Sequence, residues 1–117
     1  MAISEAHVAS VTSTTAELSL TGSTAGTTVI QSQTTDGIYQ LWVDFNAAAS
    51  GDEFRIIAYE KVNAGTQRIA YQTNLVGPQS PPLFVLPSLI LMDGWDFTLT
   101  RMAGANRTVT ASVRKVA

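Results

Sequence analysis

The chain of 117 residues contains no cysteine and a single histidine, and only 14% of its residues are charged. Without cysteine, the chain forms neither disulfide bonds nor thiolate metal sites, and it has no thiol nucleophile. A single histidine excludes zinc sites built from several imidazole or thiolate ligands. The low charge, combined with 45% hydrophobic residues, argues against a disordered chain.

The net charge is small, −2 at neutral pH, and the basic residues are scattered apart from the pair Arg114-Lys115. A basic stripe that would attract nucleic acid or an anionic membrane is therefore missing. The longest apolar run, residues 83–92, is too short to span a bilayer and contains Pro87. The first residues lack the basic and apolar regions of a secretion signal, so we expect a soluble protein.

What the sequence does contain is an alternation of apolar and polar residues in four segments, residues 16–21, 39–45, 95–100 and 108–114. A period of two residues is typical of β-strands that turn one face to a core and the other to water. The alternation therefore predicts half-buried strands over most of the chain.

Two further segments, residues 54–62 and 67–76, alternate less regularly but are rich in Ile, Tyr and Val, which favour strands. The short loop between them predicts a β-hairpin. A strand is also expected over residues 27–33. The alanine run at residues 46–50 is compatible with a single helical turn or with an irregular loop.

About eight to ten short strands predict an all-β fold of two packed sheets, because one sheet alone would leave an apolar face in water. We expect a sandwich with jelly-roll or related Greek-key topology, in which the hairpin of residues 54–76 is central. A single domain is expected to span residues 1–117. Residues 1–12 carry few large apolar groups and could form an extended N-terminal arm rather than a core strand.

No catalytic, cofactor or metal site emerges from the residue pattern. His7 lies in the N-terminal segment without a nucleophile motif, so a solvated or interface histidine is expected. Asp52-Glu53 and the pair Asp93 and Asp96 lack the spacing of a calcium loop. A carboxylate pair for glycoside cleavage is conceivable, but nothing singles one out. We therefore expect neither an enzyme nor a cofactor.

Two features are candidates for binding. Gln40, Trp42 and Asp44 share one strand face, where an aromatic ring beside polar groups would suit sugar stacking; the alternative is that Trp42 packs at a sandwich edge. The proline-flanked run of residues 80–87 cannot be an ordinary central strand, and it predicts an edge segment over the core or a docking patch for a neighbouring subunit. With the N-terminal segment, it supplies the candidate interface residues Ile3, His7, Val8, Pro81, Pro82, Leu83, Phe84, Val85 and Leu86.

Residues 36–45, 49–57 and 59–61 resemble a family of small structural proteins of tailed bacteriophages, and so do residues 89–99 and 104–107. The matching segments are strand-and-turn patterns, and they begin after the first 35 residues. The family comprises capsid decoration, or cement, proteins. The resemblance implies an all-β module that binds the outside of an assembled shell, often as a trimer at symmetry axes, and it carries no catalytic residues.

The expected function is therefore that of a virion structural protein, a decoration protein on the capsid exterior that is made in the host cytoplasm. Its expected partners are the major capsid protein and copies of itself, as a homotrimer, with no nucleic acid and no membrane. The alternative is a carbohydrate-binding or tail-associated adhesion module, which would use Gln40, Trp42 and Asp44.

Overall fold

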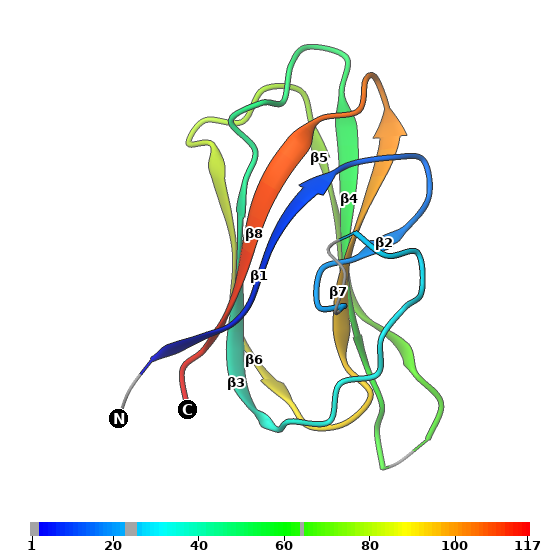
Figure 1. Ribbon diagram of the computed structural model, residues 1–117, viewed down its shortest axis with the longest axis vertical. Helices are drawn as coiled ribbons and strands as arrows, with labels where there is room; N and C mark the ends of the chain where they lie inside the picture. Colours follow the sequence, from blue (N-terminus) through cyan, green and yellow to red (C-terminus); the bar gives the residue numbers. More distant parts are fainter. Residues whose placement is uncertain (1–2, 23–25, 64) are drawn as a thin grey trace.

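The computed structural model describes residues 3–22, 26–63 and 65–117, and these ranges contain two antiparallel four-stranded sheets (Figure 1). The sheet that we call sheet A has the order β1-β8-β3-β6, and sheet B has the order β2-β7-β4-β5. Within the described ranges, no helix capable of crossing a membrane was found. The strands are β1 (Ser4–Thr12), β2 (Leu18–Ser19), β3 (Gly37–Asp44), β4 (Glu53–Glu60), β5 (Arg68–Val76), β6 (Leu83–Leu91), β7 (Asp96–Ala103) and β8 (Thr108–Lys115).

The pairing of the strands defines a jelly roll. Strand β1 pairs with β8, β2 with β7, β3 with β6 and β4 with β5, so the chain is one long hairpin that is folded over on itself. The pairs β3–β8 and β4–β7 then join this hairpin into the two sheets. The predicted jelly-roll sandwich is confirmed. The hairpin of β4 and β5 is the innermost of the nested strand pairs, where the long hairpin turns back.

The core lies between the inner faces of the two sheets, as the period of two predicts. Trp95, which directly precedes β7, is its largest buried side chain, and its ring centroid lies 4.4 Å from that of Tyr39 and 5.9 Å from that of Phe97. Strand β3 alternates inward and outward residues without interruption. The central strand β3 contributes the fully buried Tyr39, Leu41 and Val43.

The expectation of an N-terminal arm does not hold for residues 4–12. They form the edge strand β1, which pairs with β8 along its length, and they bury Ala9 and Val11 in the core. Small side chains suffice there because an edge strand at the rim of a sandwich has little volume to fill. Residues 1–2 lie outside the described residues.

The prediction of a strand at residues 27–33 is wrong. This segment makes only isolated bridges, from Thr27 to Ser19 and from Gln33 to Trp95. Val29 in this segment is 65% exposed, so the segment does not extend a ladder with a buried apolar side. Residues 46–50 form turns without a helix, in agreement with the irregular loop among the two alternatives.

The proline-flanked run begins the edge strand β6, in agreement with the expected edge segment. Pro87 falls where the register between β3 and β6 shifts, between the pairs Leu41–Leu86 and Tyr39–Leu89. Proline cannot donate to a ladder, so an edge position beside an irregularity is where a strand tolerates it.

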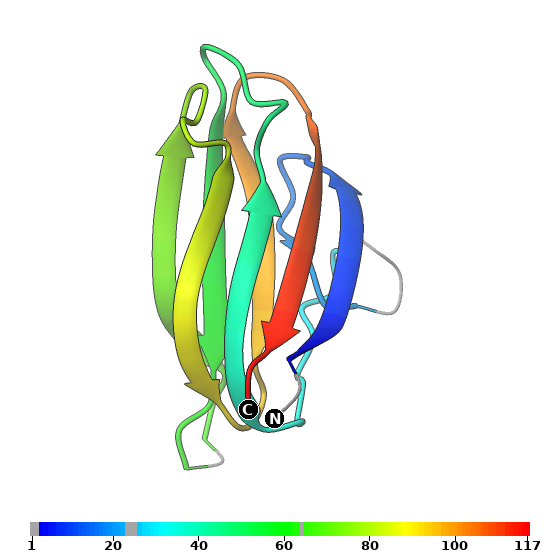
Figure 2. The same cartoon turned by 90° about the vertical axis from the view of Figure 1, so that its left-hand side faces the viewer.

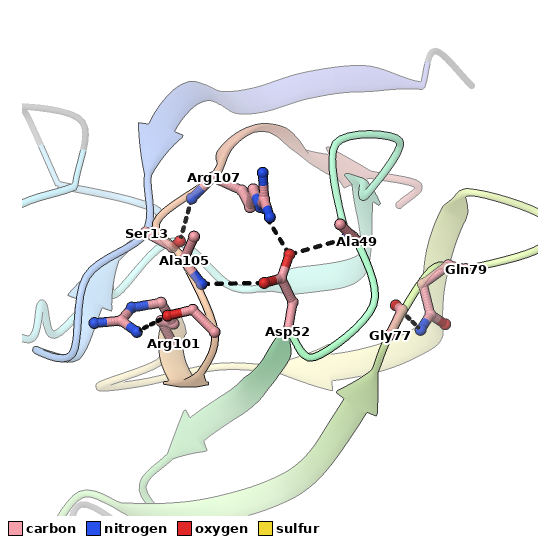
Figure 3. Close-up of polar contacts among 9 residues, drawn as sticks. Ser13, Ala49, Asp52, Gly77, Gln79, Arg101, Ala105 and Arg107 are labelled. Atoms are coloured by element: carbon pink, nitrogen blue, oxygen red, sulfur yellow. Dashed lines mark hydrogen bonds and ion pairs between the residues drawn. The ribbon is translucent and has the colours of Figure 1, made fainter.

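At one end of the sandwich, a buried carboxylate ties the connections between strands together (Figure 3). Asp52, only 1% exposed, accepts hydrogen bonds from the backbone of Ala49 and Ala105 and pairs with Arg107 at 2.7 Å. Arg107 in turn exchanges hydrogen bonds with Ser13 in the β1–β2 connection. These bonds hold the carboxylate ionised, and the pKa of Asp52 is lowered to about 2, chiefly by the Arg107 hydrogen bond.

The close approach of Asp52 to Gly104 predicts different costs for two glycine substitutions. Both Gly51 and Gly104 have positive φ, +89° and +84°, but a Cβ at position 104 would lie 2.6 Å from the Cα of Asp52, whereas the space at position 51 is open. Gly51→Ala should lower the free energy of unfolding by about 1–2 kcal/mol through backbone strain. Gly104→Ala should cost at least ~1 kcal/mol more. Urea denaturation measures both, and equal costs would contradict the packing of Asp52 against Gly104.

The low pKa of Asp52 predicts a loss of stability in acid. Its folded value of about 2 lies below the ordinary 3.8, so its ionised form stabilises the fold above about pH 4, and this contribution disappears as the pH falls towards 2. Asp52→Asn should therefore be less stable than the unmodified chain at neutral pH, and the difference should shrink in acid. Chemical denaturation at several pH values measures it. Asp36→Asn, at an exposed carboxylate, is the matched control, and a constant difference across pH would refute the prediction.

Candidate docking surface

The outer face of sheet A is not crossed by any segment that the structure describes (Figure 2). Its outward side chains line up in rows across all four strands. One row consists of Val8, Ser112, Trp42 and Val85, which are paired in register from β1 to β6. This surface, formed by the outward residues of β1, β8, β3 and β6, is called here the A face.

Sheet B differs because residues 26–36 run along its outer side, away from sheet A (Figure 1). The buried Asp96 of β7 anchors this segment. It accepts hydrogen bonds from Ser19 and Thr21 hydroxyls and from the Gln31 backbone. Burial raises the pKa of Asp96, while these hydrogen bonds oppose the rise. The segment therefore lies against β2 and the start of β7.

A second carboxylate, that of Glu17, is hydrogen-bonded to side chains of β4 and β7 on the same side of sheet B. Glu17 accepts hydrogen bonds from the Tyr59 hydroxyl at 2.5 Å and from Thr98 at 2.6 Å. Burial and the hydrogen bond to Glu17 raise the pKa of the Tyr59 phenol. Both polar clusters thus have partners within the chain, and they serve to hold the covering segments in place.

On the A face, polar contacts link side chains from one edge to the other. The Ser112 hydroxyl donates to Glu5 at 2.6 Å, and the Nε of Arg114 donates to Ser112 at 3.2 Å. The guanidinium carbon of Arg114 then lies 4.5 Å from the centroid of the Trp42 ring. This is a cation–π contact, which holds both side chains in one arrangement.

The chain of contacts continues beyond Trp42 to the last strand of the sheet. The indole nitrogen of Trp42 donates to Gln40 at 3.2 Å, and the Gln40 amide donates to Ser88 of β6 at 3.2 Å. Trp42 is therefore half-buried and ordered by its neighbours. An open depression of about 280 Å³ lies beside it, lined by Trp42, Val43, Asp44, Leu83, Thr110, Ala111, Ser112 and Arg114.

Apolar side chains mark the two margins of the A face. Val8, 61% exposed, lies on β1, and Leu83 and Val85, 48% and 37% exposed, lie on β6. Ile3 is also exposed, next to the start of β1, and Pro81 is exposed before β6. The two groups of predicted interface residues thus lie on one sheet but at opposite edges of it, with Trp42 between them.

Four of the predicted interface residues are less available. His7 and Phe84 are half-buried and Leu86 is fully buried, because these three belong to the inner faces of their strands. His7 packs edge-on against Trp95, and burial lowers its pKa despite the nearby charge of Asp96. Pro82 is half-buried and its carbonyl accepts a hydrogen bond from the backbone of the β3–β4 connection. A docking contact must therefore use the outward residues.

The face assignment of Gln40, Trp42 and Asp44 agrees with the alternation in the sequence. What the alternation did not reveal is Arg114, whose side chain covers one face of the indole. The alternation of β8 does place Arg114 on the outward side of that strand. Only the pairing of β8 with β3, however, brings the Arg114 side chain next to Trp42. Within the described residues, no group of three or more His, Cys, Asp or Glu side chains could hold a metal ion.

Three comparisons with known proteins were made, and no protein-family model, curated protein or solved structure matches this chain.

The contact between Arg114 and Trp42 predicts a change in the accessibility of the indole. Arg114→Ala should increase acrylamide quenching of Trp42 fluorescence, because it uncovers the ring. It should cost about 1 kcal/mol or less in the free energy of unfolding, as expected for an exposed cation–π contact. The buried Trp95 provides a constant background, which Trp42→Phe measures by itself. Unchanged quenching would show that Arg114 does not cover the ring in solution.

Proposed function

We propose that this chain is a virion structural protein, a decoration protein that binds the outer surface of an assembled tailed-phage shell through its A face. The observation that carries the proposal is an uncovered sheet face with ordered side chains and apolar margins. Sheet faces that meet only water do not need aromatic and aliphatic residues in register, whereas docking surfaces use them. The resemblance in residues 36–45 and 89–99 supports the same role.

The side-chain contacts of the A face favour association energetically. Arg114 and Trp42 are held by their neighbours before any partner arrives, so little side-chain entropy is lost on binding. Tryptophan and arginine are also the residue types that most often dominate interface energies. Each copy needs only a modest contact, because many copies on one lattice together reinforce the shell.

The proposed partners are the major capsid protein and copies of this chain, and the proposed location is the capsid exterior. The homotrimer implied by the resemblance stays a prediction, as do synthesis in the host cytoplasm and the absence of catalysis, nucleic acid and membrane from its function. A tail-associated position would use the same face.

A glycan-binding function is the alternative, with Gln40, Trp42 and Asp44 as the platform. Arg114 already covers one face of the Trp42 ring, and Gln40 is engaged by the indole nitrogen, so the ring is less free to stack on a sugar. The depression beside Trp42 is the observation in its favour. A fluorescence change on adding sugars, lost in Trp42→Ala, would support this alternative over shell binding.

The proposal predicts that Val85, on the A face, is needed for capsid binding and that Val62, which lies outside the A face, is not. Purified protein should co-sediment with capsids that were assembled without it, and it should raise their melting temperature. Val85→Lys, in the central row of the A face, should reduce occupancy at least ~10-fold, because it buries a charge in the contact. Val62→Lys, at an exposed valine beyond the end of β4, is the matched control and should bind normally.

Circular dichroism of both variants checks that the fold is kept. Absence of binding by the unmodified chain would overturn the proposal, and so would equal binding by the two variants. Deletion of residues 1–12 is not a suitable test, because it removes β1 and the buried Ala9 and Val11 from sheet A.

A further inference from the structure

The two sheets end in four edge strands, and three of these carry features that hinder pairing with another chain. Strand β2 is short and is flanked by Thr27, which bridges to Ser19. Strand β1 has an irregularity in its register between Glu5 and His7. Strand β6 contains Pro87. Charges, bulges, proline and short length are the devices by which edge strands avoid unwanted pairing.

Strand β5 lacks these devices over most of its length. Its register with β4 shifts once, near Ala70, and is then regular from Tyr71 to Val76. Residues 71–76 contain neither proline nor a charged side chain. No other segment that the structure describes pairs with the free edge of β5. This edge therefore presents a row of unpaired backbone groups beside uncharged side chains.

The side of the sandwich formed by β5 and β6 is also incompletely covered (Figure 2). Tyr71 is 39% exposed and Val76 is 68% exposed. Leu75 of β5, with Phe84 and Leu89 of β6, packs against the core but is only partly buried. A partner at this edge would thus gain apolar burial as well as backbone hydrogen bonds.

We infer that β5 pairs with β5 of a second copy of this chain, antiparallel about a two-fold axis at Thr73. The two four-stranded B sheets then become one continuous eight-stranded sheet. The contact is isologous and closes after two copies, because each edge is used once. It goes beyond the proposed function, since it needs no shell, and it differs from the three-fold association that the resemblance implies.

The sequence of β5 is complementary to itself in this register. With Thr73 on the axis, Tyr71 lies opposite Leu75 of the second copy, and Gln72 lies opposite Asn74. Opposite residues of an antiparallel pair share a face, so the first pair is apolar, the second joins two amides, and Thr73 meets its own copy. No like charges meet. This match between the strand and its own reverse favours a second copy over an unrelated partner.

An axis at Gln72 fits less well. It would draw the irregular Ala70 into the ladder opposite Asn74, whereas an axis at Thr73 leaves the central pairs within the regular part of the strand. The amide of Asn74 is already positioned by Glu53 at 2.7 Å and by Arg55 at 3.1 Å. The Asn74 side chain, which forms one of the pairs next to the axis, is thus held in place before the second copy binds.

Charge variants at the exposed positions 72 and 74 test the contact without touching the core. The unmodified chain should be a concentration-dependent dimer in sedimentation equilibrium. Gln72→Lys with Asn74→Lys should be monomeric, because each lysine faces a lysine of the second copy, and Gln72→Glu with Asn74→Glu should be monomeric for the same reason. An equimolar mixture of the two should recover the dimer. Ser32→Lys with Thr34→Lys, at exposed positions outside both the β5 edge and the A face, is the matched control and should still dimerise.

Cross-linking gives a second test, since the chain has no cysteine of its own. Thr73→Cys places one thiol on the axis, where opposite Cβ atoms are about 4.5–5.5 Å apart, and oxidation should give a covalent dimer. Ser10→Cys should give none above background. A monomer at every concentration, a trimer that is indifferent to the lysine pair, or equal cross-linking of the two cysteine variants would each overturn the inference. These outcomes are independent of whether the A face binds a shell.

Discussion

Each sheet of this protein has two faces, and the core between the sheets buries only one face of each. The outer faces have to be covered by other segments or be compatible with water. The two sheets differ in this respect. On sheet B, Asp96 and Glu17 hold polar side chains and the segment of residues 26–36 against β2 and the start of β7. On sheet A, a row of side-chain contacts through Arg114 and Trp42 orders the surface and leaves it open.

This difference separates two kinds of contact on one small molecule. The A face is broad and ordered and carries apolar margins, which suits docking onto a larger surface. The free edge of β5 is narrow and uncharged, and it offers backbone groups in a regular row, which suits addition of another strand. The A face and the β5 edge belong to different sheets, so the two contacts use different residues of one copy.

Much of the fold followed from local patterns, and the failures have local causes. The alternation in residues 39–45 and 108–114 predicted strands β3 and β8 with the correct inward residues. Strand β1 was missed as a core strand because Ala9 and Val11 are its main buried groups. Residues 27–33 have the composition of a strand, but they pair with other segments only at two isolated bridges. Whether a partner strand is available for continuous pairing is not encoded in local composition.

For residues 39–45, 95–100 and 108–114, the sequence by itself determined the strand and which of its sides is apolar, because a period of two is a local property. It also indicated that residues 80–87 cannot form an ordinary central strand, since proline has no amide hydrogen to donate, and the structure then placed β6 at an edge. Only the tertiary structure decided that Arg114 lies over Trp42, that no described segment crosses the outer face of sheet A and that β5 has a free edge. These features depend on which strands pair, and the paired segments lie far apart in the chain. Several strands have similar compositions, so composition alone does not specify which of them pair.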